Sequence, residues 1–342
     1  MINFSFNRNK SFAIDLGNNN TMVTDQEKVL LSQPSYIVFN AANNSVKAVG
    51  DKAYDMFEKT HEELKPVKPM KGGVIADYDS ASRMIHELVN KVYSSSYWLR
   101  GFNNIITGVP FYTTEVEKRA LRDTMDQFNS RHKYLIYEPL AAAIGMDMNI
   151  SAPDGKLVID IGGGITEIVV ISLSGIAAFQ SVKVAGDTFD MNIQDHFRKC
   201  YNMAIGMKSA EQIKIRVGAV QKDLTEAPEP FMVKGKDMIT GIPVTRKIDH
   251  CEVAEILDKS ISSIEHSILK TLETCPPELA ADIYETGLYV TGGSAFLRGL
   301  KERFESRISL KVHIDHDPML TVSRGISKVL KDTKKYKGVL FE

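Results

Sequence analysis

The 342-residue chain contains little cysteine, and none of it is arranged for metal binding. The three cysteines, Cys200, Cys251 and Cys275, lie far apart, and no CxxC pair occurs. An odd number of widely separated thiols does not build a disulfide framework, and structural zinc sites usually use closely spaced pairs of ligands. We therefore expect reduced thiols, as in a cytoplasmic protein.

The sequence also lacks a long apolar run, a signal-peptide pattern and an excess of charge. Its best apolar stretch, Leu157 to Ile171, contains Asp160 and Glu167. No stretch reaches the roughly 18 apolar residues that a membrane-spanning helix needs. The formal net charge of -1 gives no general attraction to nucleic acid. We expect a cytoplasmic chain with no nucleic-acid partner, and peripheral attachment to a membrane stays open.

Strands and helices alternate along the chain, which indicates an α/β fold. A chain of this length is long for one hydrophobic core, so we expect two lobes with a cleft. Capping residues mark four expected helix starts: Asp79, Thr114 with Glu117, Ser209 with Gln212, and Asp249 with Glu252. The helix after Thr114 is expected to bury Val116. A late strand, Leu288 to Val290, is expected to lead into a helix from Phe296.

A strand–turn–strand motif occurs twice in the sequence. The first copy predicts a strand over residues 10–17, a turn over 18–20 and a returning strand over 21–24. The second predicts a strand over 156–161, a turn over 162–164 and a strand over 165–172. The segments Asp15-Leu16-Gly17-Asn18-Asn19-Asn20-Thr21 and Asp160-Ile161-Gly162-Gly163-Gly164-Ile165-Thr166 share the frame D-[L/I]-G-x-x-x-T. Two matched loops can grip one ligand from both sides.

The composition of these loops favours phosphate as the ligand. Turns of glycine and small polar residues direct consecutive backbone N–H groups into a concave nest that suits phosphate oxygens. Asp15 and Asp160, at the strand ends, would hold Mg²⁺ through its waters, because this ion keeps much of its hydration shell and takes other oxygens from phosphates. For either loop alone, ordinary turn chemistry explains the residues equally well. The repetition favours phosphate binding.

A third glycine loop follows the late strand. Gly292 and Gly293, with Ser294 and Ala295 after them, lie between a predicted buried strand and a predicted helix start. Such a loop lets the backbone approach a ligand closely. As the third loop of the set, it indicates the site of the nucleoside part of a nucleotide.

Two phosphate loops followed by a late glycine loop resemble the superfamily of actins, sugar kinases and heat-shock chaperone ATPases. Within it, the chain is similar to the MreB family of bacterial actins over nearly its whole length. The matching segments occur in family order: Phe12–Gly17, Gly72–Asp77, Gly108–Pro110, Glu138–Gly145, Val158–Gly164, Val184–Asp187, Ala210–Lys214 and Gly292–Leu300.

The resemblance implies an actin-like fold, in which two lobes each contain a related α/β subdomain around a nucleotide cleft. The implied division is subdomain IA at 10–32, 71–145 and 318–338, IB at 33–70, IIA at 146–183 and 249–317, and IIB at 184–248. ATP is the implied nucleotide, with GTP as an alternative, together with Mg²⁺. Subunits of this family join head to tail in paired protofilaments, a contact that does not close on itself.

The resemblance also implies roles for individual residues. Residues expected to contact the nucleotide are Asp15, Gly17, Asn18, Asn19, Asn20, Thr21, Gly162, Gly163, Gly164, Asp187, Glu211, Gln212, Lys214, Gly292, Gly293, Ser294 and Ala295. Glu211 and Lys214 are expected beside the ribose and base, although by themselves they read equally well as a surface ion pair. Glu138 and Thr166 are expected near the hydrolytic water. A helix-terminal charge is the plainer explanation of Glu138.

The chain departs from the family pattern at both loops. The family usually has two threonines after the glycines, whereas this chain has Ile165 followed by Thr166. One hydroxyl expected beside the hydrolytic water is therefore missing, and slow hydrolysis is expected. Asn18 and Asn19 stand where the family usually has threonine and alanine; both can donate hydrogen bonds, so nucleotide binding is expected to persist.

A membrane contact is expected at a loop that MreB proteins insert into lipid. Tyr97, Trp98, Leu99 and Phe102 lie there, including the only tryptophan of the chain, and aromatic residues suit a membrane interface. A buried position under a helix end is the alternative for Trp98. The resemblance further implies a peripheral location on the inner face of the cell membrane, with membrane morphogenesis proteins of the MreC and RodZ type as partners.

The sequence thus predicts a membrane-associated filament protein that binds ATP, hydrolyses it slowly, and organises cell-wall synthesis to maintain cell shape. A small-molecule kinase of the same superfamily is one alternative, but no motif for a sugar-sized pocket with its own base was found. A scaffold that binds nucleotide with negligible hydrolysis is the other, and Ile165 favours it.

Overall fold

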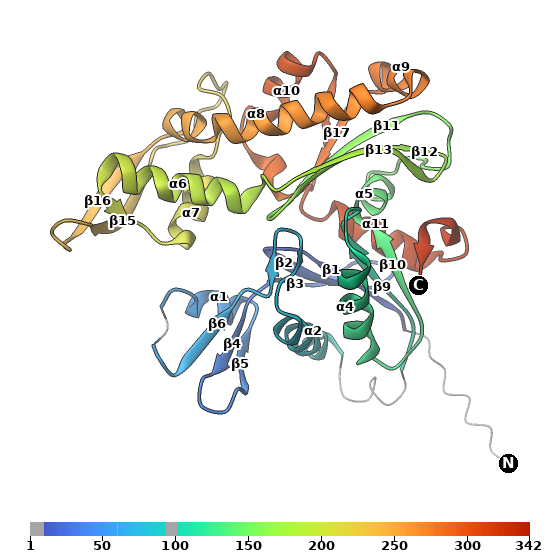
Figure 1. Cartoon of the computed structure of the whole chain (residues 1–342), viewed down its shortest axis with the longest axis horizontal. Helices are drawn as coiled ribbons and strands as arrows, with labels where there is room; N and C mark the ends of the chain where they lie inside the picture. The colour runs from blue at the N-terminus through green and yellow to red at the C-terminus, as the bar shows by residue number, and fades with distance from the viewer. Residues whose placement is uncertain (1–9, 60, 94–100) are drawn as a thin grey trace. The chain divides into compact units, whose positions relative to one another are not determined.

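The computed structural model describes residues 10–59, 61–93 and 101–342 in two compact units (Figure 1). Unit 1 contains the chain up to residue 152, residues 173–175 and residues 319–342. Unit 2 contains residues 153–172 and 176–318. Two units agree with the two lobes expected from the length. The finer division into subdomains IA, IB, IIA and IIB stays a prediction.

A six-stranded sheet forms the centre of unit 1. Its order is β19-β10-β9-β1-β2-β3. Strand β1 pairs antiparallel with β2 and parallel with β9, and β10 continues parallel to β9. The strands are β1 (Phe12–Leu16), β2 (Asn20–Thr24), β3 (Val29–Pro34), β9 (Phe102–Val109), β10 (Ser130–Tyr137) and β19 (Leu340–Phe341). The first predicted hairpin is therefore confirmed.

Helices cover both faces of this sheet (Figure 1). They are α2 (Tyr78–Val92), α4 (Glu115–Asp126), α5 (Glu138–Gly145) and α11 (Thr321–Lys331). Alternate residues of β1, namely Phe12, Ile14 and Leu16, pack with α2 and α4 in one core cluster. The capping box of Thr114 and Glu117 is confirmed. Two expectations are wrong: Asp77 rather than Asp79 caps α2, and Val116 is 79% exposed because it lies on the outer face of α4.

Smaller elements complete unit 1. A three-stranded sheet has the order β5-β4-β6 and packs against α1, and a two-stranded ribbon follows it. The elements are β4 (Ile37–Asn40), β5 (Val46–Val49), α1 (Asp51–Met56), β6 (Leu64–Val67), β7 (Met70–Lys71), β8 (Val74–Ile75) and the 3-10 turn η2 (Lys337–Val339).

Unit 2 is built on a five-stranded sheet of the order β13-β12-β11-β17-β18. Strand β11 pairs antiparallel with β12 and parallel with β17, and β18 continues parallel to β17. This repeats the arrangement of β2, β1, β9 and β10 in unit 1. The strands are β11 (Lys156–Ile161), β12 (Thr166–Ser172), β13 (Gly175–Val182), β17 (Leu288–Thr291) and β18 (Val312–Ile314). The two similar sequence segments therefore lie in sheets with the same strand topology.

The remaining elements of unit 2 include a β14-β15-β16 sheet. The elements are α6 (Gly186–Tyr201), β14 (Met203–Ala204), α7 (Met207–Val217), β15 (Phe231–Asp237), β16 (Pro243–Ile248), α8 (His250–Thr274), α9 (Pro277–Thr286), η1 (Gly293–Phe296) and α10 (Leu300–Ile308). Asp249 caps α8 as expected, since its carboxylate accepts from the Glu252 N–H.

Two predicted helix starts in unit 2 are wrong. Ser209 lies inside α7, which already begins at Met207 after Gly206, so the spacing of Ser209 and Gln212 imitates a capping box without being one. No α-helix begins at Phe296: this residue ends the short turn η1, and α10 begins only at Leu300.

Helices α5 and α11 cross at unusually short range. A Cβ atom added to Gly325 would overlap the carbonyl oxygen of Ala141. On the neighbouring turn, Arg324 Nε and Lys328 Nζ each donate to the Gly145 carbonyl at 3.1 Å. Cationic groups at a helix C-terminus satisfy carbonyls that have no partner within the helix. Helix α11 therefore fixes α5, whose first residue is Glu138.

We predict that Gly325→Ala lowers the free energy of unfolding by about 3 kcal/mol, because the added methyl group has no space between the helices. Urea unfolding followed by circular dichroism measures this. Gly338→Ala is the matched control, because a Cβ at that exposed glycine meets nothing within 4 Å. Equal stability of the two variants would contradict the packing described.

Candidate functional site

The two hairpins place equivalent residues at equivalent positions. In the first, Asp15 pairs with Met22 and Leu16 with Thr21. In the second, Asp160 pairs with Glu167 and Ile161 with Thr166. Each hairpin thus carries an aspartate one residue before the end of its first strand and a threonine opposite the final residue.

The backbone of the first loop is held from one side by Ser35. Ser35 Oγ donates to the Gly17 carbonyl at 2.8 Å, and the Ser35 N–H donates to the Asn19 carbonyl at 2.8 Å. In a trans peptide, the C=O of one residue points opposite to the N–H of the next. The N–H groups of Asn18 and Asn20 therefore point away from Ser35, as an anion-binding nest requires. Sequence reasoning missed Ser35.

The asparagine side chains of this loop are oriented through their oxygens. Asn18 Oδ1 accepts from the Gly73 N–H at 3.3 Å, and Asn19 Oδ1 accepts from Lys68 Nζ at 2.6 Å. An amide group whose oxygen is engaged directs its NH₂ donors elsewhere. Both substitutions from the family pattern are therefore compatible with a donor-rich loop.

The second loop is held in the same way by different groups. The Gly162 carbonyl accepts from the Gly186 N–H at 3.1 Å, and the Gly163 carbonyl accepts from the Asp187 N–H at 2.7 Å. Gly186 and Asp187 form the N-terminus of α6. The N–H groups of Gly163 and Gly164 consequently point away from α6.

The two threonines of the repeat have structural hydrogen bonds. Thr21 Oγ1 lies 2.9 Å from Ser35 Oγ, and Thr166 Oγ1 donates to the Val184 carbonyl at 2.6 Å. Both side chains are fully buried. The Thr166 hydroxyl fastens the second hairpin to the segment before α6, and its expected role near the hydrolytic water stays a prediction.

Asp15 is a half-buried carboxyl group at the start of the first loop. Burial raises the pKa of Asp15 above its ordinary value, and a hydrogen bond donated by Ser323 Oγ at 2.7 Å opposes this rise. A carboxylate that is costly to ionise gains from a nearby cation. Among the described residues, no group of three or more His, Cys, Asp or Glu side chains forms a metal cage. A single carboxylate suits Mg²⁺ held through its waters better than a bare metal cage, and the assignment of Asp15 and Asp160 to Mg²⁺ stays a prediction.

The third loop lies against the second within unit 2. Gly292 has φ +88°, and a Cβ added there would overlap Asp160 Oδ1 and the Ile161 carbonyl oxygen. Ser294 Oγ donates to the Gly162 carbonyl at 3.2 Å. Only glycine fits at this position, so the turn η1 with Gly293, Ser294 and Ala295 is fixed beside the glycine loop.

Lys214 is paired inside unit 2 with a residue that the sequence did not single out. Lys214 Nζ donates to Asp190 Oδ2 at 2.8 Å and to the Gly186 carbonyl at 3.1 Å. The Lys214 ammonium group therefore contacts the N-terminal part of α6. Glu211 is half-buried one turn earlier on α7, whereas Gln212 is exposed. Contact of these three residues with a nucleotide stays a prediction.

Burial raises the pKa of Asp190 to about 6; Lys214 opposes this rise, and Glu211 and Asp187 add to it. A carboxyl group whose pKa is raised on folding contributes stability that is complete below about pH 3.8 and is lost as the pH rises through about 6. Lowering the pH from 7.5 to 5.0 should therefore stabilise the wild type relative to Asp190→Asn, by about 1 kcal/mol. Urea unfolding of both proteins at the two pH values measures this, and a pH-independent difference would contradict it.

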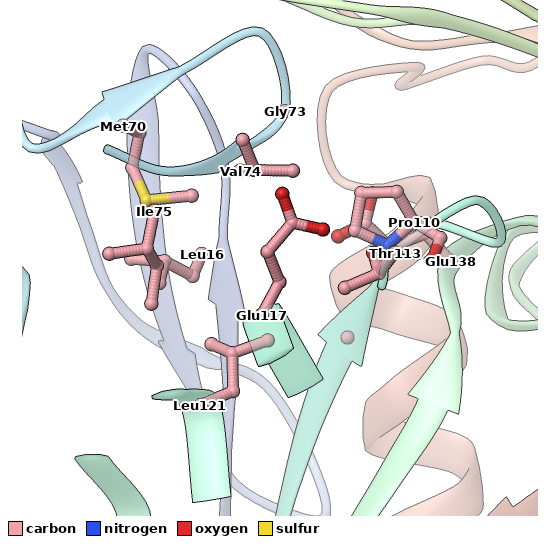
Figure 2. Close-up of a pocket in the computed structure, with 11 residues that line it drawn as sticks. Leu16, Met70, Gly73, Val74, Ile75, Pro110, Thr113, Glu117, Leu121 and Glu138 are labelled. Atoms are coloured by element: carbon pink, nitrogen blue, oxygen red, sulfur yellow. Dashed lines mark hydrogen bonds between the residues drawn. The ribbon is translucent and has the colours of Figure 1, made fainter. Parts of the chain in front are cut away.

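Glu138 lies at the wall of a small pocket in unit 1 (Figure 2). Apolar groups, including Leu16, Val74 and Pro110, line most of it. The second carboxylate of the pocket, Glu117, accepts from Thr114 N and Thr114 Oγ1 at 2.8 Å each. Glu117 and Glu138 are thus the two carboxylates that line this pocket, and Glu117 also caps α4.

The structure tests one of the four expected membrane residues. Phe102 is fully buried, with its ring 4.7 Å from that of Phe12 and 5.2 Å from that of Tyr93. It belongs to the core because it begins the central strand β9, so its assignment to the membrane is wrong. Tyr97, Trp98 and Leu99 lie outside the described residues. No helix among the described residues is long and apolar enough to cross a membrane.

Comparison with known sequences gives matches along nearly the whole chain. The family model for MreB/Mbl protein matches residues 9–338. The cell shape-determining protein MreB of Escherichia coli (strain K12) is 35% identical over 334 residues, covering 96% of this chain and 95% of that protein. The cell shape-determining protein Mbl of Bacillus subtilis (strain 168) is 35% identical over 327 residues, covering 95% and 97%.

Solved structures with the same fold are also found. MreB5 of Spiroplasma citri bound to AMPPNP superposes with a TM-score of 0.90 at 32% identity, covering 96% of this chain and 98% of that chain. A chain of the MamK double helical filament has a TM-score of 0.77 at 19% identity, covering 94% and 99%. The expected actin-like fold is thereby confirmed.

Proposed function

The chain belongs to the MreB/Mbl family, and on that premise we propose that it is a cytoskeletal ATP-binding protein that forms filaments and helps to determine cell shape. One observation carries the phosphate-binding part of this proposal: in both hairpins the loop carbonyls are bound from one side, so that N–H groups point to the other. The nucleotide-bound relatives, MreB5 with AMPPNP and MreB5 with ADP, support an adenine nucleotide.

Within this proposal, the residues of each unit have distinct tasks. The N–H groups of Asn18, Asn20, Gly163 and Gly164 bind phosphate oxygens. Bound Mg²⁺ would reduce the negative charge on the phosphates, with Asp15 and Asp160 holding its waters. Glu138 orients, and accepts a proton from, the water that attacks the terminal phosphate. The apolar lining of its pocket strengthens the electrostatic interaction between carboxylate and water.

We extend the proposal to assembly and location. Family membership supports head-to-tail paired protofilaments that lie on the inner face of the cell membrane and organise cell-wall synthesis. Tyr97, Trp98 and Leu99 are the proposed lipid contacts, and proteins of the MreC and RodZ type are the proposed partners. The contribution of Phe102 is withdrawn because that residue is in the core.

Sedimentation with anionic liposomes tests this function. Purified protein is incubated with ATP, ADP or no nucleotide, and each pellet is viewed by electron microscopy. Paired filaments on lipid in the presence of nucleotide are the expected result. Tyr97→Ser with Trp98→Ser should move the filaments from lipid to solution without preventing assembly. A protein that stays monomeric under every condition would contradict the proposal.

Hydrolysis is predicted to be slow because Ile165 stands beside the glycine loop without a hydroxyl and Thr166 is buried. We predict that Ile165→Thr raises the single-turnover rate of phosphate release roughly tenfold. Ile165→Val is the matched control, since valine has the shape of threonine and no hydroxyl. Glu138→Gln should lower the rate about 100-fold in either background. If the Val and Thr variants are equally fast, the missing hydroxyl does not limit hydrolysis.

A further inference from the structure

Lys68 lies against the first loop although no sequence motif includes it. It follows β6, and its Nζ is 2.6 Å from Asn19 Oδ1. The Lys68 side chain is half-buried, whereas Lys65, three residues earlier in the same segment, is exposed. An ammonium group has a full positive charge and three hydrogen-bond donors. One of the donors of Lys68 is directed at the loop.

An aromatic cluster fixes the position of this ammonium group. Lys68 Nζ lies 5.9 Å from the centroid of the Tyr36 ring. That ring packs edge-on against Tyr54 at 5.3 Å and Phe57 at 4.8 Å. Tyr36 also directly follows Ser35, which holds the backbone of the same loop. The charge is therefore positioned together with the loop, which reduces the entropy cost of using it to bind an anion.

The residues that follow Lys68 in the chain help to line the pocket that contains Glu138. Met70, Gly73 and Val74 line that pocket (Figure 2), and the Gly73 N–H donates to Asn18 Oδ1 in the first loop. The first loop and the pocket are thus bridged by residues 68–74. In the proposed function, this pocket holds the water that attacks the terminal phosphate. A cation next to the loop is accordingly near the phosphate that changes during hydrolysis.

We propose that Lys68 binds the terminal phosphate of a nucleoside triphosphate and so makes the chain prefer ATP to ADP. This rests on the proposed ATP binding. In the absence of that phosphate, Lys68 Nζ donates a hydrogen bond to Asn19 Oδ1. The phosphate, carrying more negative charge than an amide oxygen, competes for the same donor and forms a charge-assisted hydrogen bond.

A purely structural role for Lys68, as a clip that holds Asn19, is the competing explanation. The two roles differ in which ligands they affect. A clip shapes the loop for any phosphate, so its loss weakens ATP and ADP equally. A contact with the terminal phosphate weakens ATP alone.

The test is equilibrium binding of ATP, ADP and adenosine, each with Mg²⁺, to the full chain and its variants. Lys68→Met removes the charge but keeps the apolar stem on Tyr36. Lys68→Arg keeps the charge. Lys65→Met removes one charge from the same segment and is the matched control for long-range electrostatics. We expect Lys68→Met to weaken ATP binding about tenfold and ADP binding less than threefold, leaving adenosine unchanged. Lys68→Arg should restore most of the ATP affinity.

The outcomes separate this inference from the function on which it rests. Equal losses for ATP and ADP would overturn it in favour of the structural clip, and so would equal effects of Lys65→Met and Lys68→Met. ATP binding that is unchanged in Lys68→Met would overturn the inference and leave the proposed function intact. A wild-type chain that binds neither nucleotide would overturn both. Thermal unfolding of Lys68→Met shows whether it is folded, and Lys68→Arg provides the comparison if it is not.

Discussion

Hydrogen bonds bind the backbone carbonyl groups of two short loops from one side, and this fixes the direction of the neighbouring N–H groups. A phosphate group can approach a loop only if carbonyl oxygens, which would repel it, point elsewhere. Ser35 binds the carbonyls of Gly17 and Asn19, and the N-terminus of α6 binds those of Gly162 and Gly163. The hairpins and the parallel strands beside them fix the loops relative to Ser35 and to the N-terminus of α6.

The two units use different donor groups to bind the carbonyls of their loops. One uses a single serine on the segment after β3, and the other uses the first N–H groups of a sixteen-residue helix. The sheet order around the hairpins is nevertheless the same, since β1 and β11 each have an antiparallel and a parallel neighbour. The two units therefore share the strand topology around the hairpin, while the hydrogen bonds that support the loops differ. The asparagine loop of unit 1 also accepts a hydrogen bond from a charged side chain, Lys68.

The features that depend on residues close together in the sequence could be predicted from the sequence. The hairpins and the caps at Thr114 and Asp249 depend on residues within a few positions of one another, and they were predicted correctly. Ser35, Lys68 and Ser323 reach the first loop over long sequence separations, so no spacing could reveal them. Ser209 failed as a cap because α7 already begins at Met207, two residues earlier. Phe102 failed as a membrane residue because it begins β9, which is buried along nearly its whole length.

Hydrogen–deuterium exchange of the backbone amides measures whether the N–H groups of the two loops bind phosphate. Exchange would be followed at residues 17–21 and 162–166 with ATP and Mg²⁺, with adenosine, and with neither. We predict that ATP slows exchange in both loops and that adenosine slows it in neither. Slowing in only one loop, or equal slowing by adenosine, would show that the two hairpins do not both bind phosphate.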